Sequence, residues 1–118
     1  MTDSLQISVD GDKDGAVIYL RGRLDIESSP DLRDRLLAIL RRQFAPETIA
    51  IDLVAVSYID TSGIATLIEG LKVARLAGIV LHLQGLQGRL LHLFQFTGMD
   101  SLFDTSGPTN NLSTTPVS

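Results

Sequence analysis

The chain has 118 residues, contains no cysteine and carries a formal net charge of −4 at neutral pH. The lack of cysteine excludes a disulfide framework, a thiolate zinc site and a cysteine nucleophile, and the acidic balance argues against nucleic-acid binding by phosphate neutralisation. Hydrophobic residues make up 44% of the sequence, which excludes a mainly disordered chain, and the length favours a single domain.

Two strands open the predicted fold. The first carries apolar residues at every second position from Leu5 to Val9, and the second is the apolar run 16–20. The Asp- and Gly-rich segment 10–15 joins them as a turn, so together they predict a hairpin. The Asp spacing in this turn is partly that of a calcium loop, but the later glycine and the terminal glutamate of such a loop are missing, which argues against a metal site.

A helix and a third strand follow the hairpin. Residues 21–27 form an irregular segment, after which Ser29 caps a helix that has Pro30 at its first helical position. Pro46 cannot continue this helix, and residues 48–53 form the next strand. A strand, a helix and a strand in this order imply a right-handed parallel crossover.

A second helix starts at residues 60–63 and carries its buried apolar stripe from Ile64 to Leu71. We expect Gly70, within this stripe, to allow close packing, and Gly78 to end the helix as a left-handed cap. A further strand over 79–83 and a last helix within 89–103 complete the predicted order, which is β-β-α-β-α-β-α.

This order predicts an α/β domain, at the border with α+β, in which helices pack mainly on one face of a four- to five-stranded mixed sheet. We expect residues 1–104 to form the domain and residues 105–118, rich in Ser, Thr, Asn and Pro, to be a disordered tail. Residues 1–15 contain no apolar core of signal-peptide length, and no apolar run approaches the ~20 residues that span a bilayer. We therefore expect a soluble, cytoplasmic protein without membrane insertion.

The stretch Asp60-Thr61-Ser62-Gly63 has the clearest chemical signal in the chain. A hydroxyl at a helix N-terminus lies where backbone N–H groups and the helix dipole favour negative charge, so a phosphoryl group can be added there without breaking the fold. The alternative interpretation is an ordinary N-cap, because Ser, Thr and Asp are the residues that cap helices. This stretch alone leaves both interpretations open.

The sequence offers few parts for catalysis or for metal binding. A serine hydrolase needs a base beside its nucleophile, but His82 is expected within a strand and His92 on a helix surface. Two scattered histidines make no metal site, and no glycine-rich phosphate loop is present. A small enzyme that pairs Asp25 with Asp60 as acid and base stays open as a rival hypothesis.

Three stretches of the sequence resemble the STAS domain of the bacterial anti-sigma factor antagonist type. Residues 22–25 with 30–33 are similar to the family's G-x-L-D segment and first helix, and residues 56–64 are similar to its D-[ST]-[ST]-G switch. Residues 89–103 match the pattern of its C-terminal helix. The resemblance covers roughly residues 5–104 and implies the STAS fold.

The resemblance implies a regulator that is not an enzyme and needs no cofactor. In this family the unphosphorylated antagonist binds an anti-sigma factor that is also a serine/threonine protein kinase, phosphorylation at the switch ends the complex, and a PP2C-type phosphatase restores it. The family's phosphoacceptor follows the aspartate directly, which is Thr61 here, with Ser62 as the second candidate. Asp25 and Asp60 match acidic positions near the partner surface, and Gly63 matches the glycine that lets the turn approach closely.

The two hydroxyls of the switch differ by about 100° around the helix axis. We therefore expect one of them, Thr61, to face a partner and the other, Ser62, to serve the local cap. The D-T-x-G form of residues 60–63 also occurs in a second branch of the family, the STAS subunit of a lipid-transport ABC complex. In that branch the helix packs on the ATPase subunit and no phosphorylation is needed.

Overall fold

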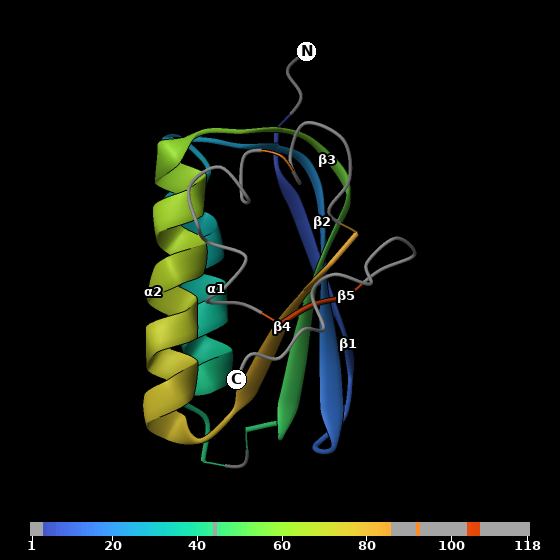
Figure 1. Cartoon of the computed structure of the whole chain (residues 1–118), viewed down its shortest axis with the longest axis vertical. Helices are drawn as coiled ribbons and strands as arrows, with labels where there is room; N and C mark the ends of the chain where they lie inside the picture. The colour runs from blue at the N-terminus through green and yellow to red at the C-terminus, as the bar shows by residue number, and fades with distance from the viewer. Residues whose placement is uncertain (1–3, 44, 86–91, 93–103, 107–118) are drawn as a thin grey trace.

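The computed structural model describes residues 4–43, 45–85, 92 and 104–106. Along the chain the elements are β1 (Gln6–Gly11), β2 (Gly15–Leu24), α1 (Ser29–Leu40), β3 (Thr48–Ile59), α2 (Thr61–Ala77), β4 (Val80–Gln84) and β5 (Asp104–Ser106). The strands form one five-stranded sheet in sequence order, with β1 antiparallel to β2 and all other neighbours parallel. The two described helices, α1 and α2, lie on one side of the sheet (Figure 1), so the predicted fold class is confirmed.

The core lies between the sheet and the two helices. Each fully buried aliphatic side chain there contributes about 1.5–3 kcal/mol relative to its exposed state. The largest fully buried side chains are Ile18, Leu20, Leu24, Leu32, Leu36, Ile49, Ile51, Leu53, Leu67 and Leu83. They come from β2, β3, β4 and both described helices. The apolar side of the sheet is therefore the side that faces these helices.

The second strand is longer than the sequence predicted. The prediction ended it at residue 20 and assigned 21–27 to an irregular segment, but β2 continues to Leu24. Burial still alternates through this part, because Arg21 and Arg23 are exposed while Leu24 is buried. The prediction missed this part of the strand because its charged residues lie on the solvent-exposed face and a glycine stands between them.

The third strand is also longer, and it contains two irregularities. The prediction covered 48–53, whereas β3 continues to Ile59 and shifts its pairing with β2 twice on the way. Each shift adds one residue to β3, as a β-bulge does. Buried side chains are therefore three apart at Leu53, Val56 and Ile59, and a period-2 search loses the strand after its first half.

The first helix starts one residue earlier than predicted. Ser28 precedes the helix, so Pro30 takes the second helical position, and no side-chain cap hydrogen bond is made there. Instead the Ser28 hydroxyl donates to the carbonyl of Arg23 at 2.8 Å, and the Ser29 hydroxyl donates to the carbonyl of Asp25 at 2.7 Å. Both hydroxyls thus tie the start of α1 to the end of β2.

Two arginines of α1 connect it to its neighbours. The Arg33 Nε donates to Glu69 Oε1 of α2 at 2.8 Å, and this hydrogen bond lowers the pKa of Glu69. The Arg35 Nη2 donates to the backbone carbonyl of Ile7 at 3.3 Å, at the outer edge of the sheet. Both arginines therefore have partners within the domain.

The C-terminal predictions lie largely outside the described residues. This holds for the helix within 89–103, except that His92 is helical and exposed as expected. Within the tail predicted as disordered from residue 105, Thr105 and Ser106 instead pair with β4 as part of β5, and 107–118 lie outside the described residues. Among the described helices, none is long and apolar enough to cross a membrane.

Two glycines of α2 take the roles that the sequence predicted. Gly78 ends the helix with φ +74°, in the left-handed region. A Cβ on Gly70 would overlap the Cδ2 atom of Leu36, and Leu36 is completely buried in α1. The close approach of the two helices therefore depends on the missing side chain at Gly70.

Gly70→Ala should lower the free energy of unfolding by up to about 2 kcal/mol, because overpacking costs about 1–3 kcal/mol and alanine regains only ~1 kcal/mol in helix propensity. Urea unfolding followed by circular dichroism measures this loss. Gly15→Ala is the matched control, because its Cβ would meet only the Thr48 carbonyl oxygen at 3.8 Å. A Gly70→Ala variant at least as stable as the parent would contradict the packing argument.

Candidate functional site

The C-terminal ends of β2 and β3 form one edge of the domain. Their last residues, Leu24 and Ile59, pair with each other, so Asp25 and Asp60 follow neighbouring strand ends. The N–H of Asp60 donates to the carbonyl of Leu24 at 3.2 Å. The turn into α2 is thereby fixed to the end of β2.

The start of α2 is capped by an aspartate. Asp60 Oδ1 accepts the N–H groups of Ser62 at 2.9 Å and of Gly63 at 3.1 Å. Thr61 is the first residue of α2 and is exposed, while Ser62 is half-buried. The expectation that a hydroxyl of Ser62 serves as the cap is therefore wrong, because the carboxylate of Asp60 already occupies both backbone donors.

Gly63 packs directly against the two strand ends. A Cβ at this position would lie 2.8 Å from the carbonyl oxygen of Leu24 and 2.8 Å from Cγ1 of Ile59. A backbone carbonyl cannot move aside as the end of a flexible side chain can. The close approach predicted for Gly63 is present, and it turns the inner side of the first helical turn toward the sheet.

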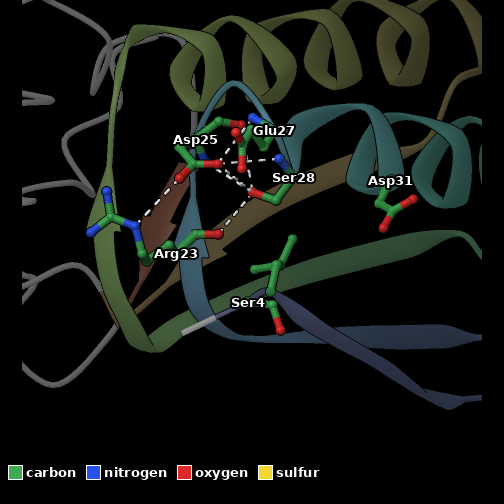
Figure 2. A pocket seen from close by; sticks show the side chains of 7 residues that line it. Ser4, Arg23, Asp25, Glu27, Ser28 and Asp31 are labelled. Atoms are coloured by element: carbon green, nitrogen blue, oxygen red, sulfur yellow. Dashed lines mark hydrogen bonds and ion pairs between the residues drawn. The ribbon is translucent and has the colours of Figure 1, made fainter. Parts of the chain in front are cut away.

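Asp25 organises the loop between β2 and α1, as Figure 2 shows. Its Oδ1 accepts the N–H groups of Glu27 at 3.0 Å and Ser28 at 3.2 Å, and its Oδ2 accepts the Arg23 Nε at 3.3 Å. Partial burial raises the pKa of Asp25, but the hydrogen bonds from Ser28, Glu27 and Arg23 outweigh it and hold the pKa below its ordinary value. The carboxylate is thus a structural anchor of this loop.

Arg23 links this loop to the other face of the sheet. Its guanidinium lies 4.0 Å from the centroid of the Tyr58 ring, in addition to the ion pair with Asp25. Sequence analysis missed this contact, because it depends on the bulge that sets Arg23 opposite Tyr58. The only sequence signal is that both residues directly precede the two strand ends.

A shallow hollow of about 350 Å³ opens beside the Asp25 loop. Its lining residues are Ser4, Leu5, Arg23, Asp25, Glu27, Ser28 and Asp31. Three of these residues are carboxylates, and the single arginine among them already pairs with Asp25. The hollow therefore presents an acidic surface at the start of α1.

The described residues do not assemble an acid–base centre. Asp25 and Asp60 accept hydrogen bonds from different backbone groups, and none of the described hydrogen bonds joins the two carboxylates. His82 pairs with Ala50, which is separated from Ile59 by the length of seven residues of the neighbouring strand β2, so it lies about 23 Å along the sheet from the start of α2. Among the residues of known placement, no three His, Asp or Glu side chains gather in a way that could hold a metal ion.

The five-stranded sheet, the two described helices on one face and the exposed helix start define a small α/β domain. The sequence profile of the STAS domain matches residues 6–114, and the chain belongs to this family. It is 27% identical to the anti-sigma-B factor antagonist of Bacillus subtilis, over 87% of this chain and 92% of that protein. It is 30% identical to the anti-sigma-B factor antagonist of Staphylococcus aureus, over 72% of this chain and 77% of that protein.

A solved structure is similar over nearly the whole chain. The unphosphorylated form of the anti-sigma factor antagonist SpoIIAA superposes with a TM-score of 0.72 at 21% identity, covering 94% of this chain and 93% of that one. The phosphorylated form of the Bacillus SpoIIAA superposes with a TM-score of 0.69 at 20% identity, covering 94% and 96%. The names of these relatives describe antagonists of anti-sigma factors.

Replacing Asp60 by alanine or by asparagine should distinguish the contribution of its cap hydrogen bonds to stability from that of its charge. Asp60→Ala should lower the free energy of unfolding by about 0.5–2 kcal/mol, because two helix N–H groups lose their acceptor, whereas Asp60→Asn should keep most of the stability. Ser62→Ala should cost less than Asp60→Ala. Thermal and urea unfolding of the three variants measure these differences, and an Asp60→Ala variant as stable as the parent would show that the cap contributes nothing.

The Asp25 anchor should make stability depend on acid pH. The folded pKa lies below the ordinary value of 3.8, so the stabilisation is present above about pH 4 and is lost as the pH falls through the folded pKa. Between pH 5 and pH 3 the parent protein should therefore lose more stability than Asp25→Asn does. Urea unfolding midpoints at a series of pH values test this, and parallel curves for the two proteins would contradict it.

Proposed function

We propose that this protein is an anti-sigma factor antagonist that works by partner switching in the cytoplasm. In its unphosphorylated form it binds an anti-sigma factor that is also a serine/threonine protein kinase. The kinase phosphorylates Thr61, with Ser62 as the second candidate, and the modification ends the complex. A PP2C-type phosphatase removes the phosphate and restores binding.

The exposed hydroxyl of Thr61 carries this proposal. It stands at the first position of α2, a helix of 17 residues, and Gly63 and Asp60 hold that turn on the strand ends. Its side chain is open to solvent, while Ser62 is half-buried. An acceptor in a rigid, exposed turn is accessible to a kinase and leaves the core untouched when it is modified.

The partner surface in this proposal comprises the exposed start of α2 and the neighbouring loop. It includes Asp25, Asp60, Thr61, Ser62 and Gly63. The names of the similar proteins from Bacillus subtilis and Staphylococcus aureus support an anti-sigma factor as the partner. The similarity to SpoIIAA in both of its forms supports a fold that tolerates phosphorylation.

A phosphate on Thr61 has opposite effects on the fold and on the complex. The helix dipole and the backbone N–H groups at the start of α2 favour negative charge, so the added dianion leaves the fold intact. A partner that docks on the same turn must desolvate that dianion beside the carboxylates of Asp25 and Asp60, which opposes binding. Because the fold tolerates the phosphate while the complex does not, the modification controls binding without unfolding the protein.

Thr61→Ala should keep binding of the anti-sigma factor kinase from the same cell and should abolish phosphate incorporation. Thr61→Glu should weaken binding by at least about tenfold, or about 1.4 kcal/mol, although one carboxylate imitates a phosphate incompletely. Thr61→Ser is the matched control and should restore phosphorylation. Calorimetry measures the affinities, and intact-mass and fragment-ion spectrometry after incubation with ATP locates the phosphate.

Two outcomes would overturn parts of the proposal. Phosphate on Ser62, still incorporated into Thr61→Ala, would show that the acceptor is assigned to the wrong hydroxyl. An absence of phosphate on both residues, together with binding to an ATPase subunit of a transporter, would replace the antagonist by the transport-complex subunit.

A further inference from the structure

The sheet face opposite the helices carries large exposed side chains on its two central strands. Tyr19 of β2 is 44% exposed, and Val54 and Tyr58 of β3 are 60% and 42% exposed. Both described helices lie on the other face (Figure 1). Tyrosine together with arginine is the composition enriched at the centre of protein interfaces. Arg21 and Arg23 provide that arginine on the same face of β2.

Between these side chains the face is hollowed. The hollow has a volume of about 590 Å³, and its lining includes Ser8, Tyr19, Arg21, Val54 and Ala55. Ala55 pairs with Arg21, and Ser8 pairs with Tyr19. Each small residue therefore stands beside a large one, so that the small side chains form the floor and Tyr19, Arg21 and Val54 form the walls.

The bulge in β3 creates this shape. Pairing shifts between Tyr19 and Arg21, so Val54 and Ala55 are both exposed although they are consecutive. Asp52 Oδ1 accepts the N–H of Val54 at 2.9 Å and holds the bulge in place. The apolar wall and the floor of the hollow are thus built into the backbone and do not depend on a flexible loop.

The charged side chains around the hollow differ in whether they already have a hydrogen-bond or ion-pair partner. Its charged lining residues are Arg21 and Asp52, and Asp52 already accepts a backbone N–H. Arg23, the next exposed arginine, is engaged with Asp25 and Tyr58. Within the described part of the chain the Arg21 guanidinium has no ion pair. The cation available to a ligand is therefore Arg21, on a protein that is acidic as a whole.

We infer that this hollow is a second docking site, which binds an extended acidic segment of a partner protein. One apolar side chain of the segment sits over Ala55 between Tyr19 and Val54, and a carboxylate two residues along, on the same side of an extended chain, pairs with Arg21. Ala55 lies four residues before the end of β3, about 10 Å along the sheet because one of them is a bulge, and on the face away from the helices. Occupancy of the hollow therefore leaves Thr61 accessible, so this site is independent of the switch.

A synthetic peptide with repeats of Leu-Ser-Glu-Ser tests the inference, because it places leucine and glutamate on one side of an extended chain. Titrated into the ¹⁵N-labelled full chain, it should shift the amide signals of Tyr19, Arg21 and Ala55. A peptide with lysine in place of glutamate should bind at least about tenfold more weakly, and so should one with serine in place of leucine.

Variants of the exposed side chains should confirm the assignment. Arg21→Glu should weaken binding of the acidic peptide by at least about tenfold and should improve binding of the lysine peptide. Arg42→Glu, the same charge reversal at an exposed position after α1, is the matched control and should leave the affinity nearly unchanged. Ala55→Leu should fill the hollow and weaken binding, and Thr61→Glu should have no effect. Circular dichroism establishes that each variant is folded.

Three results would overturn the inference. The first is an absence of shifts at Tyr19, Arg21 and Ala55 at millimolar peptide, and the second is an equal loss of affinity in Arg21→Glu and Arg42→Glu. The third is concentration-dependent self-association of the chain that is abolished by Arg21→Glu, because the face would then be covered by a second copy.

Discussion

The contact between the end of β2 and the start of α2 sets the rest of the site. The carbonyl of Leu24 accepts the N–H of Asp60, and the bare Cα of Gly63 rests against the same carbonyl. With the inner side of the turn closed by this contact, the first helical side chain, Thr61, meets solvent. The exposure of the candidate acceptor is thus a consequence of backbone packing and not of loop flexibility.

The Asp25 loop belongs to the same unit, because it leaves β2 directly after Leu24. Its carboxylate holds two N–H groups of its own loop, and two serine hydroxyls fasten α1 to the strand. Two connections that are distant in the sequence therefore form one rigid surface. When a partner docks there, little conformational entropy is lost in ordering the surface, and this preorganisation favours affinity.

Local patterns predicted the order of strands and helices and the roles of Gly70 and Gly78, because close helix packing and a left-handed cap demand glycine there, whereas the close approach at Gly63 was expected from the family resemblance. They did not predict which residue caps α2, since aspartate, serine and threonine are equally good caps and only the backbone angles select among them. The second half of β3 was not predicted, because its bulges place buried side chains every three residues instead of every two. The three residues of β5 carry no apolar signal of their own, and pairing with β4 alone makes them a strand.

Arg35 changes the outer edge of the sheet. An edge strand exposes unpaired carbonyl and N–H groups that invite strand addition from another chain. On β1 one such carbonyl, that of Ile7, is occupied by a guanidinium that reaches over from α1. A foreign strand that paired there would have to displace a charged group held by the domain's own helix. The contact thereby occupies one of the acceptors that strand addition along β1 would need.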